Sequence, residues 1–112
     1  DPNPVAGPQH PPIPGVHNSG WMQAPGAARL ADKSQHGKLE AYVKDIVGRF
    51  ANDDRVLAWD VWNEPNNDGG GNYKPTPNKK AMVAGLLGQV FDWARGAKPE
   101  RSPRLTCASW PW

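Results

Sequence analysis

The fold of this chain is decided by the segment Val56-Leu57-Ala58-Trp59-Asp60-Val61-Trp62-Asn63-Glu64-Pro65. Residues 56–62 are rich in β-branched and aromatic side chains and are mostly apolar on both alternating faces. This pattern is typical of a parallel strand that is covered on both sides. Asp60 is its one polar interruption, and Glu64-Pro65 ends the strand. Residues 66–77 are loaded with Asn, Gly and Pro, which favours a loop.

An amphipathic helix is predicted on each side of this strand, because apolar residues recur at helical spacing. The stripe of the first helix, over 38–50, consists of Leu39, Tyr42, Val43, Ile46, Val47 and Phe50. That of the second, over 78–95, consists of Met82, Val83, Leu86, Leu87, Val90, Phe91 and Ala94. A final strand is expected at 105–110. Residues 38–112 thus follow the order helix, strand, helix, strand of a parallel α/β fold.

The first 37 residues are expected to form a long loop. Their breakers, Pro11-Pro12, Pro14-Gly15 and Pro25-Gly26, leave no room for a regular element of any length. A chain of 112 residues can bury one small core. We therefore expect a single domain over 1–112. Its abrupt first and last residues suggest a segment cut from a larger fold.

Composition excludes several classes of partner. The net charge is only +2, and the 13 Lys and Arg are interspersed with 11 Asp and Glu, so no basic stripe is available for nucleic acid. No apolar run is long enough to cross a membrane. The single Cys107 cannot form an internal disulfide and does not identify the compartment, so secretion or a periplasmic location stays open.

No metal or other cofactor is expected. The three histidines lack the spacing of paired ligands on a helix, and Cys107 stands alone. The run from Glu64 to Gly69 faintly resembles a calcium loop, but Pro75 occupies the position of the bidentate glutamate. Cys107 also lacks a partner base for nucleophilic chemistry, and it lies in the predicted last strand. We expect it to be a core residue.

Asn63-Glu64-Pro65 lies where an apolar strand ends and a loop begins, which in barrel folds is the catalytic face. A carboxylic acid that protonates a departing sugar oxygen needs a raised pKa. Apolar surroundings for Glu64 can come from tryptophans, namely Trp59, Trp62 and Trp110. The adjacent Asn63 can donate to a sugar hydroxyl, and such a bond lowers the barrier if it strengthens in the transition state.

The stretch 59–65 resembles the fourth-strand signature of clan A glycoside hydrolases, and it looks nearest to family 5 cellulases and related xylanases. The resemblance extends to 55–58 and, upstream, to Gly15-Val16-His17-Asn18-Ser19-Gly20-Trp21, which is similar to a loop after the third strand in some bacterial members. It implies a (β/α)8 barrel that hydrolyses a β-1,4-linked glycan with retention. It also implies that the glutamate after Asn, here Glu64, is the acid/base. The family's nucleophile is a second glutamate at the end of strand seven.

The resemblance covers only part of such a barrel, which needs about 250 residues. This sequence corresponds to the span from the third-strand loop to the fifth strand, and only Asn63 and Glu64 of the catalytic set carry over. Asp60 lies too far along the strand to stand about 5 Å from Glu64, and Glu100 falls in a loop at the other end of the barrel. The alternative function is therefore a catalytically incomplete piece that at most binds carbohydrate, and we expect such a piece to be poorly stable or to self-associate.

Aromatic and polar residues near the motif are the remaining site candidates. Flat aromatic faces suit sugar rings, and we assign Trp21, Trp62 and Trp110 to the cleft. Trp59 and Trp93 lie on regular elements and are expected in the core. His17 and Asn18 lie in a loop, where they either contact sugar or are simply solvated. Neither the glycan nor the oligomeric state follows from the sequence.

Overall fold

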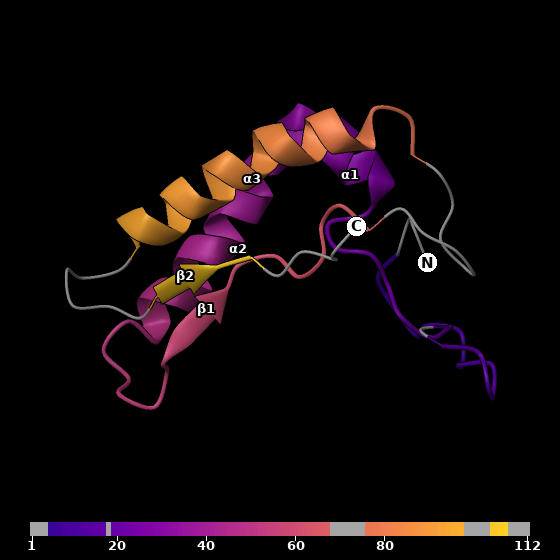
Figure 1. The fold of residues 1–112 in the computed structure, drawn as a ribbon, viewed down its shortest axis with the longest axis horizontal. Coiled ribbons are helices and arrows are strands. Elements are labelled where there is room, and N and C mark those ends of the chain that lie inside the picture. Colours follow the sequence, from indigo (N-terminus) through magenta and orange to yellow (C-terminus); the bar gives the residue numbers. More distant parts are fainter. Residues whose placement is uncertain (1–4, 18, 68–75, 98–103, 108–112) are drawn as a thin grey trace.

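The structure, a computed structural model, describes residues 5–17, 19–67, 76–97 and 104–107. Its elements in chain order are α1 (Ala27–Ala31), the 3₁₀ helix η1 (Lys33–Gln35), α2 (His36–Arg49), β1 (Ala58–Asp60), α3 (Lys79–Gly96) and β2 (Arg104–Thr106). The two strands lie side by side, and α2 and α3 lie together on one side of them (Figure 1). None of the described helices has the length and apolar character to cross a membrane.

The two long helices confirm the prediction from periodicity. α2 begins at His36 and α3 ends at Gly96, each within two residues of the expected bounds. On α3 the buried positions are Val83, Leu86, Val90 and Ala94, which follow the three-to-four-residue spacing of one helical face. This face forms the larger part of the hydrophobic core.

The expectation that residues 1–37 form one long loop is wrong from residue 27 onward. The segment 27–31 reads Ala-Ala-Arg-Leu-Ala, which has high helix propensity, and its Leu30 is buried in the core. The Pro25-Gly26 pair stops no helix, because Gly26 is the N-cap of α1. Asp32 then starts η1, since its Oδ1 accepts from the backbone N–H of Ser34 at 3.0 Å.

The strands pair in parallel, as predicted, with Trp59 opposite Leu105 in the register. β1 is shorter than the expected 56–62. The last strand, expected at 105–110, begins at Arg104 and ends at Thr106; Cys107 lies outside it, and residues 108–110 lie outside the described residues. The expected cover on both faces of β1 is not found. Ala58 and Asp60 are exposed, and only the intervening Trp59 is half-buried. Among the described residues, the helices pack on one face of the sheet and nothing covers the other.

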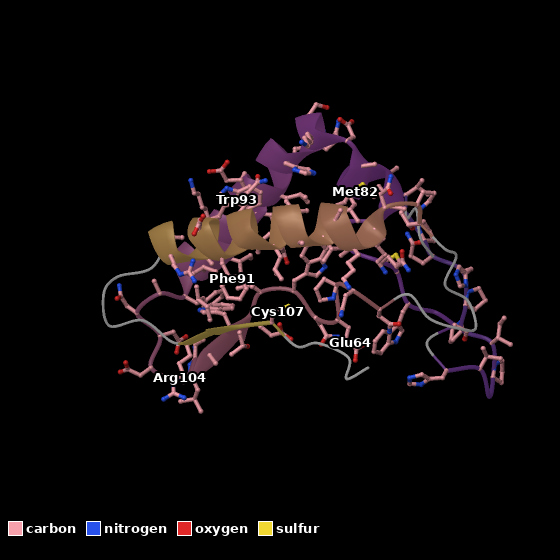
Figure 2. All side chains as sticks on the ribbon, turned by 45° about the horizontal axis from the view of Figure 1, so that its top comes forward. Glu64, Met82, Phe91, Trp93, Arg104 and Cys107 are labelled. Atoms are coloured by element: carbon pink, nitrogen blue, oxygen red, sulfur yellow. The ribbon has the colours of Figure 1, made fainter. Side chains whose placement is uncertain are left out.

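The core lies between α1, α2 and α3. Leu30, Val83, Leu86 and Val90 form a buried cluster. Its half-buried neighbours are Leu39, Val43, Val61, Trp62, Met82 and Trp93. Trp93 is thus a core residue, as expected, and Figure 2 shows it on the same helix as Met82. Because Val61 and Trp62 also belong to this group, the core fixes the chain just after β1.

Candidate active site

The backbone turns sharply after β1. The N–H of Val61 still donates to the carbonyl of Thr106 at 3.0 Å, which extends the parallel ladder by one bond. Three residues later Glu64 adopts a φ of 46°, in the left-handed region. A non-glycine residue there costs about 1–3 kcal/mol and is common at active sites. The N–H of Asn67 closes the turn on the carbonyl of Glu64 at 3.0 Å.

Glu64 opens onto a cavity of about 260 Å³. The wall is built from segments that are distant in the sequence, namely 21–27 with Leu30, 62–65 with Asn67, and Thr76 with Lys79. In Figure 2 Glu64 lies at the far end of the sheet from Arg104, where β2 begins. The cavity is therefore at the carboxyl end of the parallel strands, the edge at which α/β proteins bind ligands.

One wall of this cavity is apolar and aromatic. Trp21 and Trp62 both line it, and Trp21 is 60% exposed. The indole Nε1 of Trp62 donates to the carbonyl of Ala24 at 3.0 Å, which ties the 21–27 segment to the turn after β1. The indole of Trp62 is held by this bond at the cavity wall, and the flat apolar face of an indole suits the ring of a sugar.

The other wall is polar. Asn67 Nδ2 donates to Glu64 Oε2 at 3.2 Å, and Lys79 Nζ donates to the backbone carbonyl of Asn67. Asn63 also lines the cavity and is exposed. Among the described lining residues Glu64 is the one carboxylate and Lys79 the one cation. The wall thus offers a carboxyl group beside several hydrogen-bond donors.

Four of the predicted site residues lie together on this cavity: Trp21, Trp62, Asn63 and Glu64. His17 does not line it; the residue is exposed, with its ring centroid 6.3 Å from that of Trp21. Asn18 and Trp110 fall outside the described residues, as do Pro75 and Glu100.

Trp59 was expected both among the apolar neighbours of Glu64 and in the core. It does not line the cavity, and its ring packs against Phe50, with centroids 6.4 Å apart. The neighbouring Asp60 is exposed on β1 and is likewise absent from the cavity wall. Within the described part of the chain, no three His, Cys, Asp or Glu side chains gather in a way that could hold a metal.

The sequence did not point to Asn67 and Lys79. Asn67 belongs to a run that was interpreted as a loop and compared with a calcium loop, and Lys79 is the first residue of α3. A Lys or Asn in such positions carries no signal of its own. Their proximity to Glu64 comes from the packing of α3 against the turn.

Cys107 contacts the main chain of a residue that lines the cavity. Its thiol donates to the carbonyl of Trp62 at 3.0 Å and is half-buried. Burial raises the pKa of the Cys107 thiol, and the negative charge of Asp60 raises it further. A thiol with a raised pKa is a poor nucleophile. Cys107 was expected in the core, but it is half-buried and does not belong to the buried cluster.

The chain matches the model of glycosyl hydrolase family 10 over residues 15–107. This match covers most of its length, and the chain belongs to that family. It is thereby related to the clan A (β/α)8 glycoside hydrolases, as the motif after β1 predicts. No curated protein and no solved structure matches the chain.

The assignment to family 10 corrects the expectation that family 5 is nearest. The residues used for that expectation, an apolar strand followed by Asn63-Glu64-Pro65, resemble a signature of the clan. The resemblance therefore led to the clan without separating its families.

Proposed function

We propose that this chain forms part of the catalytic domain of a retaining endo-β-1,4-glycanase, with Glu64 as the acid/base. One observation carries the proposal. In a chain of this family, Glu64 follows a parallel strand and is the one carboxylate among the described residues that line a cavity with a tryptophan wall. The substrate class is a β-1,4-linked glycan such as xylan or cellulose.

In the first step a nucleophilic carboxylate attacks the anomeric carbon, the bond from that carbon to the bridging oxygen breaks, and Glu64 gives its proton to the departing oxygen. In the second step Glu64, now a carboxylate, takes a proton from a water that attacks the same carbon and releases the nucleophile. Asn63 would donate to a sugar hydroxyl beside the scissile bond. Trp21 and Trp62 would stack on sugar rings.

The barrel architecture is part of this proposal. β1, α3 and β2 form a strand–helix–strand unit with parallel strands, which is the repeating unit of a (β/α)8 barrel. We assign the chain to the span from the third-strand loop to the fifth strand, as a single partial barrel segment. The exposed face of β1 would then be the surface that the remaining barrel covers.

A second candidate is a chain that binds a glycan without cleaving it. It is favoured by the cavity wall itself, which in the described residues holds one carboxylate, whereas retention requires two at about 5 Å. The test is to assay the 112-residue chain on soluble xylan and cellulose while its mass in solution is measured. Glu64-dependent turnover by a monomer would refute the view that the nucleophile lies elsewhere.

The role of Glu64 is tested by Glu64→Gln in the full-length protein that contains this chain. General acid catalysis contributes about 10²–10⁴-fold, so kcat/KM for an unactivated xylo-oligosaccharide should fall by that factor. An aryl glycoside with an acidic phenol needs little protonation, so its kcat/KM should fall far less.

Glu40→Gln is the matched control, because Glu40 on α2 pairs with Lys44 and does not line the cavity. It should leave both substrates unaffected. Equal losses on the two substrates in Glu64→Gln would contradict the acid/base role.

A further inference from the structure

We propose that Asn67 is a positioning residue that fixes which oxygen of Glu64 delivers the proton, and that Lys79 holds Asn67 in place. The proposal rests on the proposed function of Glu64. It is carried by three hydrogen bonds: two lie within the turn after β1, between Asn67 and Glu64, and the third joins that turn to the first residue of α3.

The first two bonds make Glu64 and Asn67 one rigid unit. Asn67 N donates to the Glu64 carbonyl at 3.0 Å, and Asn67 Nδ2 donates to Glu64 Oε2 at 3.2 Å. The main-chain carbonyl and the side-chain carboxyl group of Glu64 are thus both held by Asn67. This double contact fits the unusual backbone of Glu64, whose φ of 46° must be maintained by its surroundings.

The side-chain bond distinguishes the two carboxyl oxygens. An amide N–H is donated to the better acceptor, which in a protonated carboxyl group is the carbonyl-type oxygen. The bond at Oε2 therefore favours the form in which the proton is on Oε1. An acid that keeps its proton on one defined oxygen, aimed in one direction, meets the geometric demand of general acid catalysis.

The third bond connects this unit to the core. Lys79 Nζ donates to the Asn67 carbonyl, and Lys79 is the first residue of α3. Four and seven residues further along that helix, Val83 and Leu86 are buried in the hydrophobic cluster. The position of Glu64 is thereby coupled to a helix that cannot shift without disturbing the core.

The chain offers a matched control at each position. Asn66 precedes Asn67 and is also half-buried, but its Oδ1 is buried without a hydrogen-bond partner among the described residues. Lys80 follows Lys79, carries the same charge, is exposed and does not line the cavity. Asn66→Ala and Lys80→Met therefore remove the same groups without touching the unit.

The contact can be tested in this chain without any activity. In a ¹⁵N-resolved NMR spectrum the side-chain amide signal of Asn67 should shift in Glu64→Ala, whereas that of Asn66 should stay. An unchanged Asn67 signal would overturn the proposal.

The catalytic consequence is tested in the full-length protein with the same two substrates that test Glu64. A small displacement of a catalytic group costs up to about 100-fold, so Asn67→Ala should lower kcat/KM for the unactivated oligosaccharide by about 10- to 100-fold. The aryl glycoside should lose much less, and Asn67→Gln should recover part of the loss. Lys79→Met should show the same substrate dependence in weaker form, and Asn66→Ala and Lys80→Met should show none.

The same measurements distinguish failure of this inference from failure of the proposed function of Glu64. If Glu64→Gln depends on the leaving group but Asn67→Ala affects both substrates equally, Asn67 has only a structural role and the inference is wrong. If Glu64→Gln itself affects both substrates equally, the proposed function fails first. A loss in Asn66→Ala as large as that in Asn67→Ala would also overturn the inference.

Discussion

Leu86→Ala and Leu57→Ala remove the same atoms from the two opposite environments of this fold. Leu86 is 2% exposed on α3, whereas Leu57, just before β1, is 84% exposed. Leu86 belongs to the buried cluster with Leu30, Val83 and Val90. The pair therefore measures how much of the stability comes from the helical core and whether Leu57 is solvated.

The expected costs differ several-fold. Truncation of a buried leucine costs about 2–5 kcal/mol, and we take about 3 kcal/mol for Leu86. Removal of an exposed side chain changes stability by about 0.5 kcal/mol or less, which is our expectation for Leu57. A domain of this size has a total stability on the order of 6–17 kcal/mol, so Leu86→Ala removes a large part of it.

Urea unfolding followed by far-ultraviolet circular dichroism is the assay, because α2 and α3 dominate the signal. With a slope of about 2 kcal/mol per M, a loss of about 3 kcal/mol lowers the midpoint by roughly 1.5 M. Leu57→Ala should move it by about 0.25 M or less. Similar shifts for both variants would refute the exposed position of Leu57. Light scattering in the same samples would then show whether a second copy covers it.

Two further predictions concern the stability of α3 and the reactivity of Cys107. A Cβ at Gly88 meets nothing within 4 Å, so Gly88→Ala should stabilise α3 by about 0.5–1 kcal/mol, which the same urea titration measures. Because burial and then Asp60 raise the pKa of Cys107, iodoacetamide at neutral pH should alkylate the folded chain more slowly than the urea-unfolded chain, as followed by mass spectrometry. Asp60→Asn should accelerate alkylation of the folded chain, and an unchanged rate would show that its charge does not act on the thiol.

Long amphipathic patterns made the helices predictable. The stripes of α2 and α3 extend over three or more turns, and a pattern of that length defines both the element and its buried face. α1 was missed because it has only five residues, too few for a periodic signal. Pro25-Gly26 was interpreted as a breaker, although a glycine can equally precede a helix as its N-cap.

The extent and cover of the strands were less predictable. The apolar character of 56–62 was interpreted as burial on both faces, but a strand is buried only where other elements pack on it. In the described residues β1 has one strand beside it and helices on one face. Leu57, which precedes β1, is also exposed although its sequence environment is that of a core strand.

The chemical centre of the site was predictable because it depends on local order along the chain. A glutamate directly after an apolar parallel strand must lie at the carboxyl edge of the sheet, so Glu64 and Asn63 follow from the strand alone. Trp62 follows for the same reason. Trp21 was assigned by its aromatic chemistry, and the structure brings it to the same cavity.

The rest of the site depends on contacts to main-chain carbonyls. The Trp62 indole reaches Ala24, the Lys79 ammonium reaches Asn67, and the Cys107 thiol reaches Trp62. Every residue type carries such an acceptor, so nothing in the identity of residues 24, 67 or 62 reveals that a bond ends there. Only the side-chain donors differ from other residues in type. Each donor lies 12 to 45 positions from its acceptor in the sequence, and the two meet only through the packing of the chain. A local motif therefore points to Glu64 as the candidate acid, whereas the position of its side chain depends on contacts made in the folded chain.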